Sequence, residues 1–344
     1  MSLRKLLLNN LSKLKRIFPG MQPNWFFKLI KGIENIEINN NYNEFRKSLI
    51  ALLRKPPKID FLGNMQQARC GANGCVYYNA RYVFPGNKMR YVAVKTFKNI
   101  DVEEKKVLPG VVVEVLIQII LSFKNKENPH LKVPEPIFFG KFKNEWVFVM
   151  QQIKNTKMFY EILQGPNDMY AYLLRLLNGL FKIQQTFNFM HRDLHGKNIL
   201  FDTKNNELYM IDFGFSCIGV RNNNHLYSFT SENASTCHND SHDVCMCLIS
   251  LYFILPTKRP QLFKLVSEIC AAYRTQKPFL PKLESNNNTD VQYPSYRYND
   301  YSKPVFHWWY LYGLTNIRTI YTPKYLSTIK CLNPLNKYFQ KLKF

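Results

Sequence analysis

The segments HRDLHGKN at 191–198 and IDFG at 211–214 carry the residues best suited to chemistry. A carboxylate can accept a proton from a hydroxyl group, and carboxylate and amide oxygens are the ligands that magnesium prefers. Phosphoryl transfer needs both functions, because the protein must aim the attacking hydroxyl and neutralise the charge of the phosphates. We therefore expect Asp193 to act as the base, and Asn198 and Asp212 to bind the metal.

Taken together, the two segments resemble the catalytic loop and the magnesium loop of the eukaryotic protein-kinase superfamily. An ordinary polar turn explains neither their order nor the agreement of further motifs upstream. The resemblance implies an enzyme that transfers the γ-phosphate of Mg-ATP to a protein substrate, with ATP and Mg²⁺ (Mg2+) as cofactors. It implies Asp193, Lys95 and Asn198 as catalytic residues, and Asn198 and Asp212 as metal ligands.

A strand and a helix upstream supply a second match. The run Val92–Lys95 resembles the strand that presents the ATP-binding lysine, with Ala93 beside the nucleotide. If this run stood alone, a surface lysine on an amphipathic strand would be favoured. Glu114 follows Lys95 by 19 residues on an expected helix, and the resemblance implies an ion pair that holds the amine towards the phosphates. The alternative partners are Glu103 and Glu104.

The segment RCGANGCV at 69–76 resembles the glycine-rich loop that covers the ATP phosphates. Gly71 and Gly74 permit close approach of the backbone to the phosphates, and Val76 is expected to contact the nucleotide. Arg69 stands where the family carries its first glycine. A plain hairpin turn is the alternative for a segment with two glycines, and the position ahead of Lys95 favours the phosphate loop.

The residues between 146 and 153 resemble the strand and hinge that receive adenine. Met150 falls where the pocket behind the base is gated, and backbone groups around Gln152 would bond to the base. Downstream, Asp243 is a good residue to start a helix and resembles the aspartate that braces the catalytic loop. The Ala-Pro-Glu signature of the family is absent after Gly214, which weakens the match at the protein-substrate platform.

Serine and threonine hydroxyls are the expected acceptors, because Ser/Thr kinases are the commoner class. His195 nevertheless stands where such kinases usually carry lysine, and Lys197 lies nearer the position of a tyrosine-kinase arginine. The missing glycine, the missing Ala-Pro-Glu and a composition rich in Asn, Lys, Tyr, Phe and Ile resemble divergent Ser/Thr kinases of large DNA viruses.

The elements that must position these residues divide the chain into three parts. Residues 1–58 are expected to form a basic helical extension with a helix over 1–18, and residues 59–150 a strand-rich part with one helix over 111–123. Residues 151–344 have mostly helical patterns, over 169–187, 243–255 and 262–274, and end in a basic tail. The resemblance implies an α+β, bilobal protein-kinase-like fold, with an antiparallel sheet in the N-lobe and a mainly α-helical C-lobe.

The net charge of +23 attracts polyanions. No base-reading motif accompanies this charge, so contact with a polyanion or nucleic acid is an added role that rests on charge alone. The basic N-terminal helix is of a type that makes peripheral membrane contact, although packing of its apolar face on its own domain is the expected arrangement. We expect no transmembrane segment, because no apolar run is long enough to span a bilayer.

The sequence contains eight cysteines without a secretory signal before them. We therefore expect free thiols in a reducing, cytoplasmic setting, which is the host cytoplasm or the virion if the chain is viral. One group has the residue types of a zinc site, but its spacing fits no closed zinc template: Cys237, His238, His242, Cys245 and Cys247.

Two other function classes compete with a protein kinase. A small-molecule kinase of the aminoglycoside or choline type also carries an Asp-Leu-His sequence like the one at Asp193, whereas the forms Val-Ala-Val-Lys and Asp-Phe-Gly favour protein acceptors. A non-catalytic pseudokinase scaffold would bind nucleotide without turnover. The presence of Lys95, Asp193, Asn198 and Asp212 argues against it.

Overall fold

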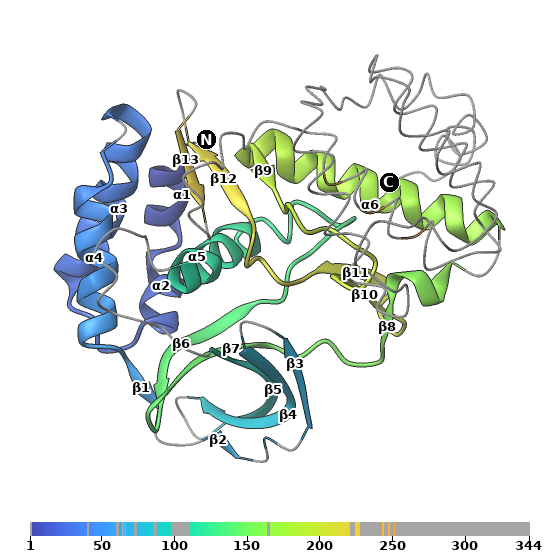
Figure 1. Cartoon of the computed structure of the whole chain (residues 1–344), viewed down its shortest axis with the longest axis horizontal. Coiled ribbons are helices and arrows are strands. Elements are labelled where there is room, and N and C mark those ends of the chain that lie inside the picture. Colours follow the sequence, from blue (N-terminus) through green and yellow to red (C-terminus); the bar gives the residue numbers. More distant parts are fainter. Residues whose placement is uncertain are drawn as a thin grey trace, which may run out of the picture.

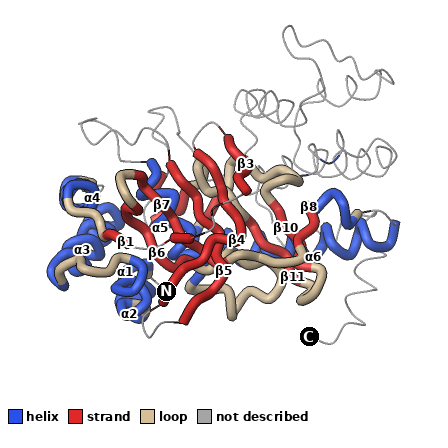
Figure 2. Tube along the Cα trace, turned by 90° about the horizontal axis from the view of Figure 1, so that it is seen from below, coloured by secondary structure: helices blue, strands red, loops and turns tan. Residues whose placement is uncertain are grey.

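The computed structural model describes residues 2–39, 41–59, 62–63, 65, 67–71, 74–84, 88–97, 110–163, 166–220, 224–227, 243, 247 and 251. In Figure 1 the N-terminal helices lie together at one side of the molecule, and the largest sheet lies beside them. Figure 2 shows the same order from below, with strands between the N-terminal helices and α6.

Seven of the described strands form one sheet, in the order β1-β6-β7-β5-β4-β2 with β3 paired to β4. All neighbours are antiparallel except β1 and β6, so the antiparallel sheet expected upstream of residue 151 is confirmed. The strands are β1 (Lys58–Ile59), β2 (Leu62–Gly63), β3 (Gln67–Gly71), β4 (Gly74–Phe84), β5 (Lys88–Phe97), β6 (Pro136–Phe142) and β7 (Glu145–Gln151).

Helix α5 (Gly110–Ser122) is apolar on nearly every side, and every residue from Val112 to Ser122 is buried. A helix that is apolar all round must be covered all round. The cover includes the N-terminal helices, whose apolar residues belong to the same buried cluster as those of α5 and β6. Glu114 and Gln118 are therefore carboxylate and amide groups held in an apolar setting.

The N-terminal segment forms four helices: α1 (Leu3–Asn9), α2 (Leu11–Ile17), α3 (Pro23–Asn39) and α4 (Asn43–Arg54). The single helix expected over 1–18 is wrong in one respect, because the chain breaks at Asn10. The Asn10 backbone N–H donates to Leu7, and its side-chain amide donates to the Leu6 carbonyl. This local bonding competes with the continuous helical ladder.

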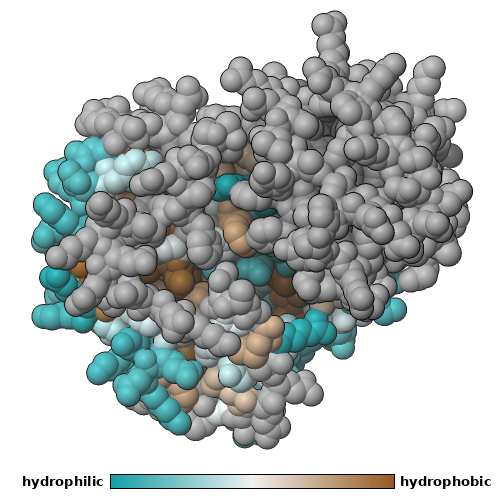
Figure 3. All heavy atoms as spheres, viewed as in Figure 1, coloured by the Kyte–Doolittle hydropathy of each residue, from teal (hydrophilic) through white to brown (hydrophobic). Residues whose placement is uncertain are grey.

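The apolar face of α1 and α2 is directed inward, as expected for packing on the same molecule. Leu7 and Leu14 are fully buried, and Phe18 contacts the ring of Phe139 on β6. Hydrophilic side chains cover the outer edge of the molecule where α3 and α4 lie (Figure 3). Among the described helices, none combines the length and the apolar character that crossing a bilayer demands.

The second part of the chain contains the long helix α6 (Pro166–Phe187), which begins slightly before the expected 169–187. Among the residues described after position 150, two small three-stranded sheets accompany it, in the orders β11-β10-β8 and β13-β12-β9. The 3₁₀ turn η1 (Phe159–Ile162) precedes α6. The strands are β8 (Thr156–Met158), β9 (Phe189–Met190), β10 (Ile199–Asp202), β11 (Glu207–Met210), β12 (Cys217–Val220) and β13 (Asn224–Tyr227).

Helices and antiparallel sheets together place the described residues in the α+β class. Within the expected helix 243–255, Asp243, Cys247 and Leu251 are helical. The expected helix 262–274 and the basic tail lie outside the described residues. The division into two lobes and the boundaries near residues 58 and 150 stay predictions.

Candidate active site

Lys95 on β5 lies between two carboxylates. Its Nζ is 2.5 Å from Oε1 of Glu114 and 3.0 Å from Oδ1 of Asp212. The ion pair with Glu114 that the family resemblance implies is therefore present, and Glu103 and Glu104 lie outside the described residues. Burial alone would lower the pKa of Lys95, but the two carboxylates outweigh it and raise that pKa. The amine thus carries a fixed positive charge.

Strand pairing places the expected nucleotide contacts on one face of the sheet. Val76 on β4 is opposite Lys95, and Ala93 on β5 is opposite Met150 on β7. Residues directly opposite each other share a face, and so do residues two apart on one strand. Val76, Ala93, Lys95 and Met150 therefore line the same face.

Two amide side chains near this face make hydrogen bonds that the sequence did not predict. Gln118 was not among the expected site residues, and Gln152 was expected to act through its backbone. Gln118 lies one turn after Glu114 on α5 and donates to the Pro134 carbonyl at 2.9 Å, with a weaker contact of 3.6 Å to the Met150 sulfur. Its spacing of four residues from Glu114 in an apolar helix was the available signal. Gln152 exchanges two 2.8 Å hydrogen bonds with Asn79 at a bulge in β4.

The glycine-rich segment is the connection between β3 and β4. Gly71 is paired with Gly74, and residues 72 and 73 at its tip lie outside the described part. A Cβ at Gly74 would lie 1.9 Å from the Thr96 carbonyl oxygen, so only glycine permits this approach of β4 to β5. Gly74 is thus held directly beside the strand of Lys95.

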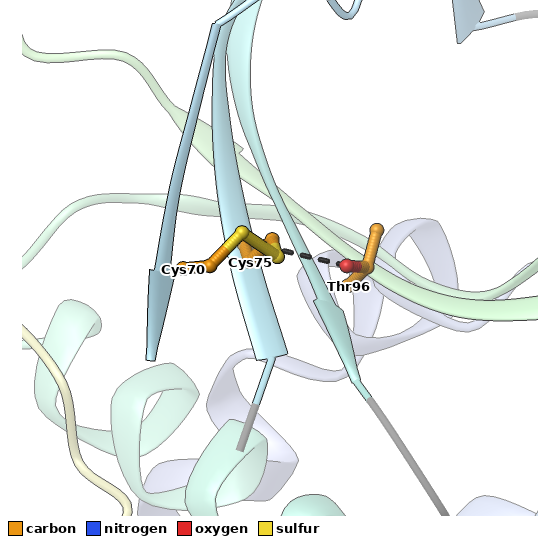
Figure 4. The surroundings of a disulfide bond; sticks show 3 residues. All are labelled: Cys70, Cys75 and Thr96. Atoms are coloured by element: carbon orange, nitrogen blue, oxygen red, sulfur yellow. Dashed lines mark hydrogen bonds between the residues drawn. A yellow bond between two sulfur atoms is a disulfide. The ribbon is translucent and has the colours of Figure 1, made fainter. Parts of the chain in front are cut away.

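The expectation of free thiols is wrong for this loop, because Cys70 and Cys75 form a disulfide (Figure 4). The two cysteines are directly opposite each other on antiparallel strands, with Cα atoms 4.0 Å apart. Cys217 is also disulfide-bonded, whereas Cys247 is buried and forms no disulfide. Sequence spacing did not reveal the pair, since the pairing depends on strand register.

The catalytic segment between β9 and β10 is closed by its own hydrogen bonds. The side-chain amide of Asn198 donates to the backbone carbonyl of Asp193 at 2.9 Å and to its Oδ2 at 3.3 Å. The backbone N–H of Ile211 donates to the carbonyl of Asn198 at 3.0 Å, which ties this segment to the one that carries Asp212. The structure therefore brings Asp193 and Asn198 together and connects both to the Asp212 segment.

Asp193 and Asp212 have pKa values shifted in opposite directions. Burial and the nearby charge of Asp212 raise the pKa of Asp193 to about 7, although the hydrogen bond from Asn198 opposes the rise. The protein around Asp212 strips some of its hydration, which alone would raise its pKa, but Lys95 holds that pKa below its ordinary value. Half of the Asp212 side chain, 51%, stays exposed.

Asp243 holds the segment between β9 and β10 in place by two hydrogen bonds, in agreement with what the resemblance implies. Its carboxylate oxygens accept the backbone N–H groups of His191 at 2.7 Å and Arg192 at 2.8 Å. Arg192 and Asp212 both have positive φ angles, 66° and 65°, which non-glycine residues rarely adopt. Strained backbone of this kind persists where surrounding contacts fix it, and it is common at functional sites.

Two histidines flank Asp193 and are neutral at physiological pH. Burial lowers the pKa values of His191 and His195 to about 4. His191 is fully buried, and its Nε2 is 2.9 Å from the Ile211 carbonyl. His195 Nδ1 accepts the backbone N–H of Lys197 at 3.2 Å, and its Nε2 lies 3.7 Å from Asp193 Oδ2. His195 therefore supplies no fixed cation at the position where Ser/Thr kinases carry lysine.

The oxygen groups present suit magnesium held together with phosphates. Magnesium takes one or two protein carboxylates and completes its shell with phosphate and water oxygens. Asp212 Oδ2 and the amide oxygen of Asn198 make no hydrogen bond within the described part of the chain. Among the described residues there is no cluster of three or more His, Cys, Asp or Glu side chains for a metal. Most of the cysteine and histidine group at 237–247 lies outside them.

Residues 70–237 match the family model of the protein kinase domain. Comparison with curated proteins gives no significant match. The matched segment contains the glycine-rich connection, the Lys95–Glu114 ion pair, the catalytic segment and Asp212. Domain match and residue geometry agree: residues 70–237 of the chain carry a protein kinase domain, which supports membership of the protein kinase superfamily.

Proposed function

We propose that the chain is a Mg-ATP-dependent kinase of serine and threonine hydroxyls in proteins. The observation that carries the proposal is the connected set of charged groups, in which Lys95 bonds both Glu114 and Asp212 while Asn198 bonds Asp193. A kinase domain supports a protein substrate generally. Serine and threonine are proposed as the acceptors because Ser/Thr kinases are the commoner class of protein kinase.

In this proposal Lys95 binds the α- and β-phosphates, and Glu114 keeps the amine aimed at them. Asp212 and Asn198 would hold magnesium, which neutralises charge on the phosphates when it is bound. The face formed by Val76, Ala93 and Met150 would receive the base, and backbone groups at Gln152 would bond to it. The glycine connection through Gly71 and Gly74 would cover the phosphates.

Asp193 would accept the proton of the attacking hydroxyl group. Its carboxylate is oriented by Asn198, and a pKa of about 7 makes it a base matched to neutral pH. Asp212 is half exposed, and its ion pair with Lys95 lowers its pKa and keeps its carboxylate charged. The two aspartates therefore take different roles because their surroundings differ.

A small-molecule kinase and a nucleotide-binding scaffold are the competing functions. The kinase-domain match favours a protein acceptor over a sugar or amine acceptor. A scaffold would not need a base, and the shift of the Asp193 pKa towards neutrality favours catalysis. A viral origin, a cytoplasmic or virion location and polyanion contact through the +23 charge are further proposals that rest on sequence style and charge.

The direct test is transfer of labelled γ-phosphate from Mg-ATP to casein, myelin basic protein and the chain itself. Replacing Asp193 by Asn should lower kcat about 10²- to 10⁴-fold, because the general base is lost while the shape is kept. Glu145→Gln is the matched control, since Glu145 is exposed at the turn between β6 and β7. Acid hydrolysis of labelled product then names the acceptor residue.

Three outcomes would contradict parts of the proposal. Label that persists at the wild-type rate in Asp193→Asn would remove Asp193 as the base. Phosphotyrosine alone in the product would replace Ser/Thr specificity. Binding of Mg-ATP without label on any protein, but with label on a sugar or amine acceptor, would establish a small-molecule kinase.

A further inference from the structure

The disulfide between Cys70 and Cys75 encloses the phosphate-covering loop. The ring that it closes contains Gly71 and Gly74, the two glycines that give the loop its backbone freedom. The cross-link therefore joins the two strands at the point where they enter and leave the loop. Forming or breaking this bond would therefore affect the loop more directly than any other element.

The sulfur atoms lie on the side of the sheet away from the nucleotide face. Successive side chains on a strand point to opposite faces, so Cys75 points away from the face that carries Val76 and Lys95. Figure 4 shows the disulfide across the first two strands, with Thr96 on the third. A nucleotide bound on the opposite face would therefore not cover the two sulfur atoms.

One cysteine of the disulfide is exposed to solvent, and the other is packed against β5. Cys70 is exposed, whereas Cys75 is only 8% exposed and sits against β5. The Cys75 carbonyl accepts the Thr96 hydroxyl at 3.4 Å, and Thr96 is the neighbour of Lys95 in sequence. Exchange of a disulfide needs access for an attacking thiolate, and Cys70 provides it.

We propose that Cys70 and Cys75 are a reversible thiol–disulfide site that controls nucleotide affinity, an inference that rests on the proposed function. The redox partner is a low-molecular-weight thiol and its disulfide, such as glutathione. In the forward reaction the two cysteine thiols lose two protons and two electrons to one disulfide of the small thiol. The products are the Cys70–Cys75 bond and two molecules of the reduced thiol.

The oxidised form binds Mg-ATP more tightly, because the cross-link keeps β3 and β4 paired through Gly71 and Gly74. With the bond reduced, the strands can part at Gly71 and Gly74, and a nucleotide must order the loop as it binds. The observed affinity for Mg-ATP then falls in proportion to the fraction of molecules whose loop is in the conformation that binds nucleotide. We expect reduction to weaken Mg-ATP binding about three- to tenfold.

To test this, the full chain is equilibrated in mixtures of reduced and oxidised glutathione, and two quantities are measured on each sample. Alkylation of free thiols followed by mass spectrometry of the peptide with Cys70 and Cys75 reports the redox state without any need for activity. Calorimetric titration with Mg-ATP reports affinity. The wild-type chain should show affinity that follows the oxidised fraction of this peptide.

Three variants separate this site from other cysteines. Cys70→Ser/Cys75→Ser should bind like the reduced wild type at every poise, and Cys70→Ser at the exposed position gives the same answer if the double variant folds poorly. Cys217→Ser is the matched control, since Cys217 belongs to a different disulfide, and it should keep the redox response. Circular dichroism checks the fold of each variant.

The inference is overturned if the pair stays reduced or stays oxidised across the whole range, or if it exchanges without any change in Mg-ATP affinity. A redox response that survives in Cys70→Ser and disappears in Cys217→Ser would also overturn it. Mg-ATP binding without a redox response contradicts this inference alone. Absence of Mg-ATP binding in both redox states contradicts the proposed function together with it.

Discussion

At the scale of single residues, two aspartates are given different chemical properties by their neighbours. Asp193 is buried with Asp212 nearby, which raises its pKa to about 7, whereas Lys95 holds the pKa of Asp212 low. Pairs of like groups whose environments separate their pKa values are a sign of an assigned acid or base role. This separation could not be derived from the sequence, because it depends on distances between segments far apart in the chain.

The raised pKa of Asp193 predicts how activity depends on pH. The carboxyl acts as a base only after it has lost its proton, so kcat/KM should rise with pH through about 7. The value at pH 6 should be about tenfold below that at pH 8. The measurement is initial rate of phosphate transfer at low substrate from pH 5.5 to 8.5, about three units. A flat profile across this range would contradict the assignment of Asp193 as the base.

At the scale of elements, β5 and α5 carry the contact that fixes Lys95. The strand pattern around Lys95 and the apolar run of α5 were predictable, because both are long enough for their composition to be informative. The strands from β8 to β13 were not, since two to four residues carry no readable periodicity. The contact between Lys95 and Glu114 came from family resemblance, and composition alone would not have chosen Glu114 over Glu103.

Replacing Glu114 by Gln tests what the contact between these elements does. The variant leaves Lys95 paired with Asp212 alone, which loosens the aim of the amine at the phosphates. We expect kcat/KM for ATP to fall about 10- to 100-fold. Glu127→Gln is the control, because it removes an exposed ion pair with Lys124 and should change kcat/KM less than twofold. Equal effects of the two changes would argue against a special role for Glu114.

Asp243 joins a helix to the catalytic segment, and its replacement should cost stability. Asp243→Asn puts an amide where two backbone N–H groups need an acceptor, so at least one buried donor loses its partner. The free energy of unfolding should fall by about 2 kcal/mol. Urea denaturation measures this, beside Glu145→Gln as an exposed control. An unchanged midpoint would show that the two hydrogen bonds are not needed for the fold.

At the scale of the whole molecule, the N-terminal helices and the sheet share one buried apolar cluster. Phe139 on β6 contacts the rings of Phe18, Phe97, Trp146 and Phe148, so an aromatic group crosses the border that sequence composition places near residue 58. The inward direction of the α1 and α2 apolar face was predictable from helical spacing. The partner of that face was not, since β6 lies more than a hundred residues later in the sequence.

Phe18 and Phe27 form a matched pair for testing this shared cluster. Phe18 is fully buried against Trp25 and Phe139, whereas Phe27 on α3 is 53% exposed. Phe18→Ala should lower the free energy of unfolding by about 3–5 kcal/mol, because it removes a buried ring and leaves a cavity. Phe27→Ala should change it by less than about 0.5 kcal/mol. Equally small effects from both would contradict a contribution of the Phe18 ring to the cluster shared by the N-terminal helices and the sheet.

The close approach of Gly140 to Pro57 has a practical consequence for shortened versions of the protein. A Cβ at Gly140 would lie 2.2 Å from the Pro57 carbonyl oxygen, and the Lys141 N–H donates to that same oxygen at 2.7 Å. A recombinant fragment cut at residue 70, where the family match begins, would lose this edge contact and strip the cover from β6 and α5. Newly bared strand edge and apolar surface promote self-association, so such a fragment would precipitate during purification.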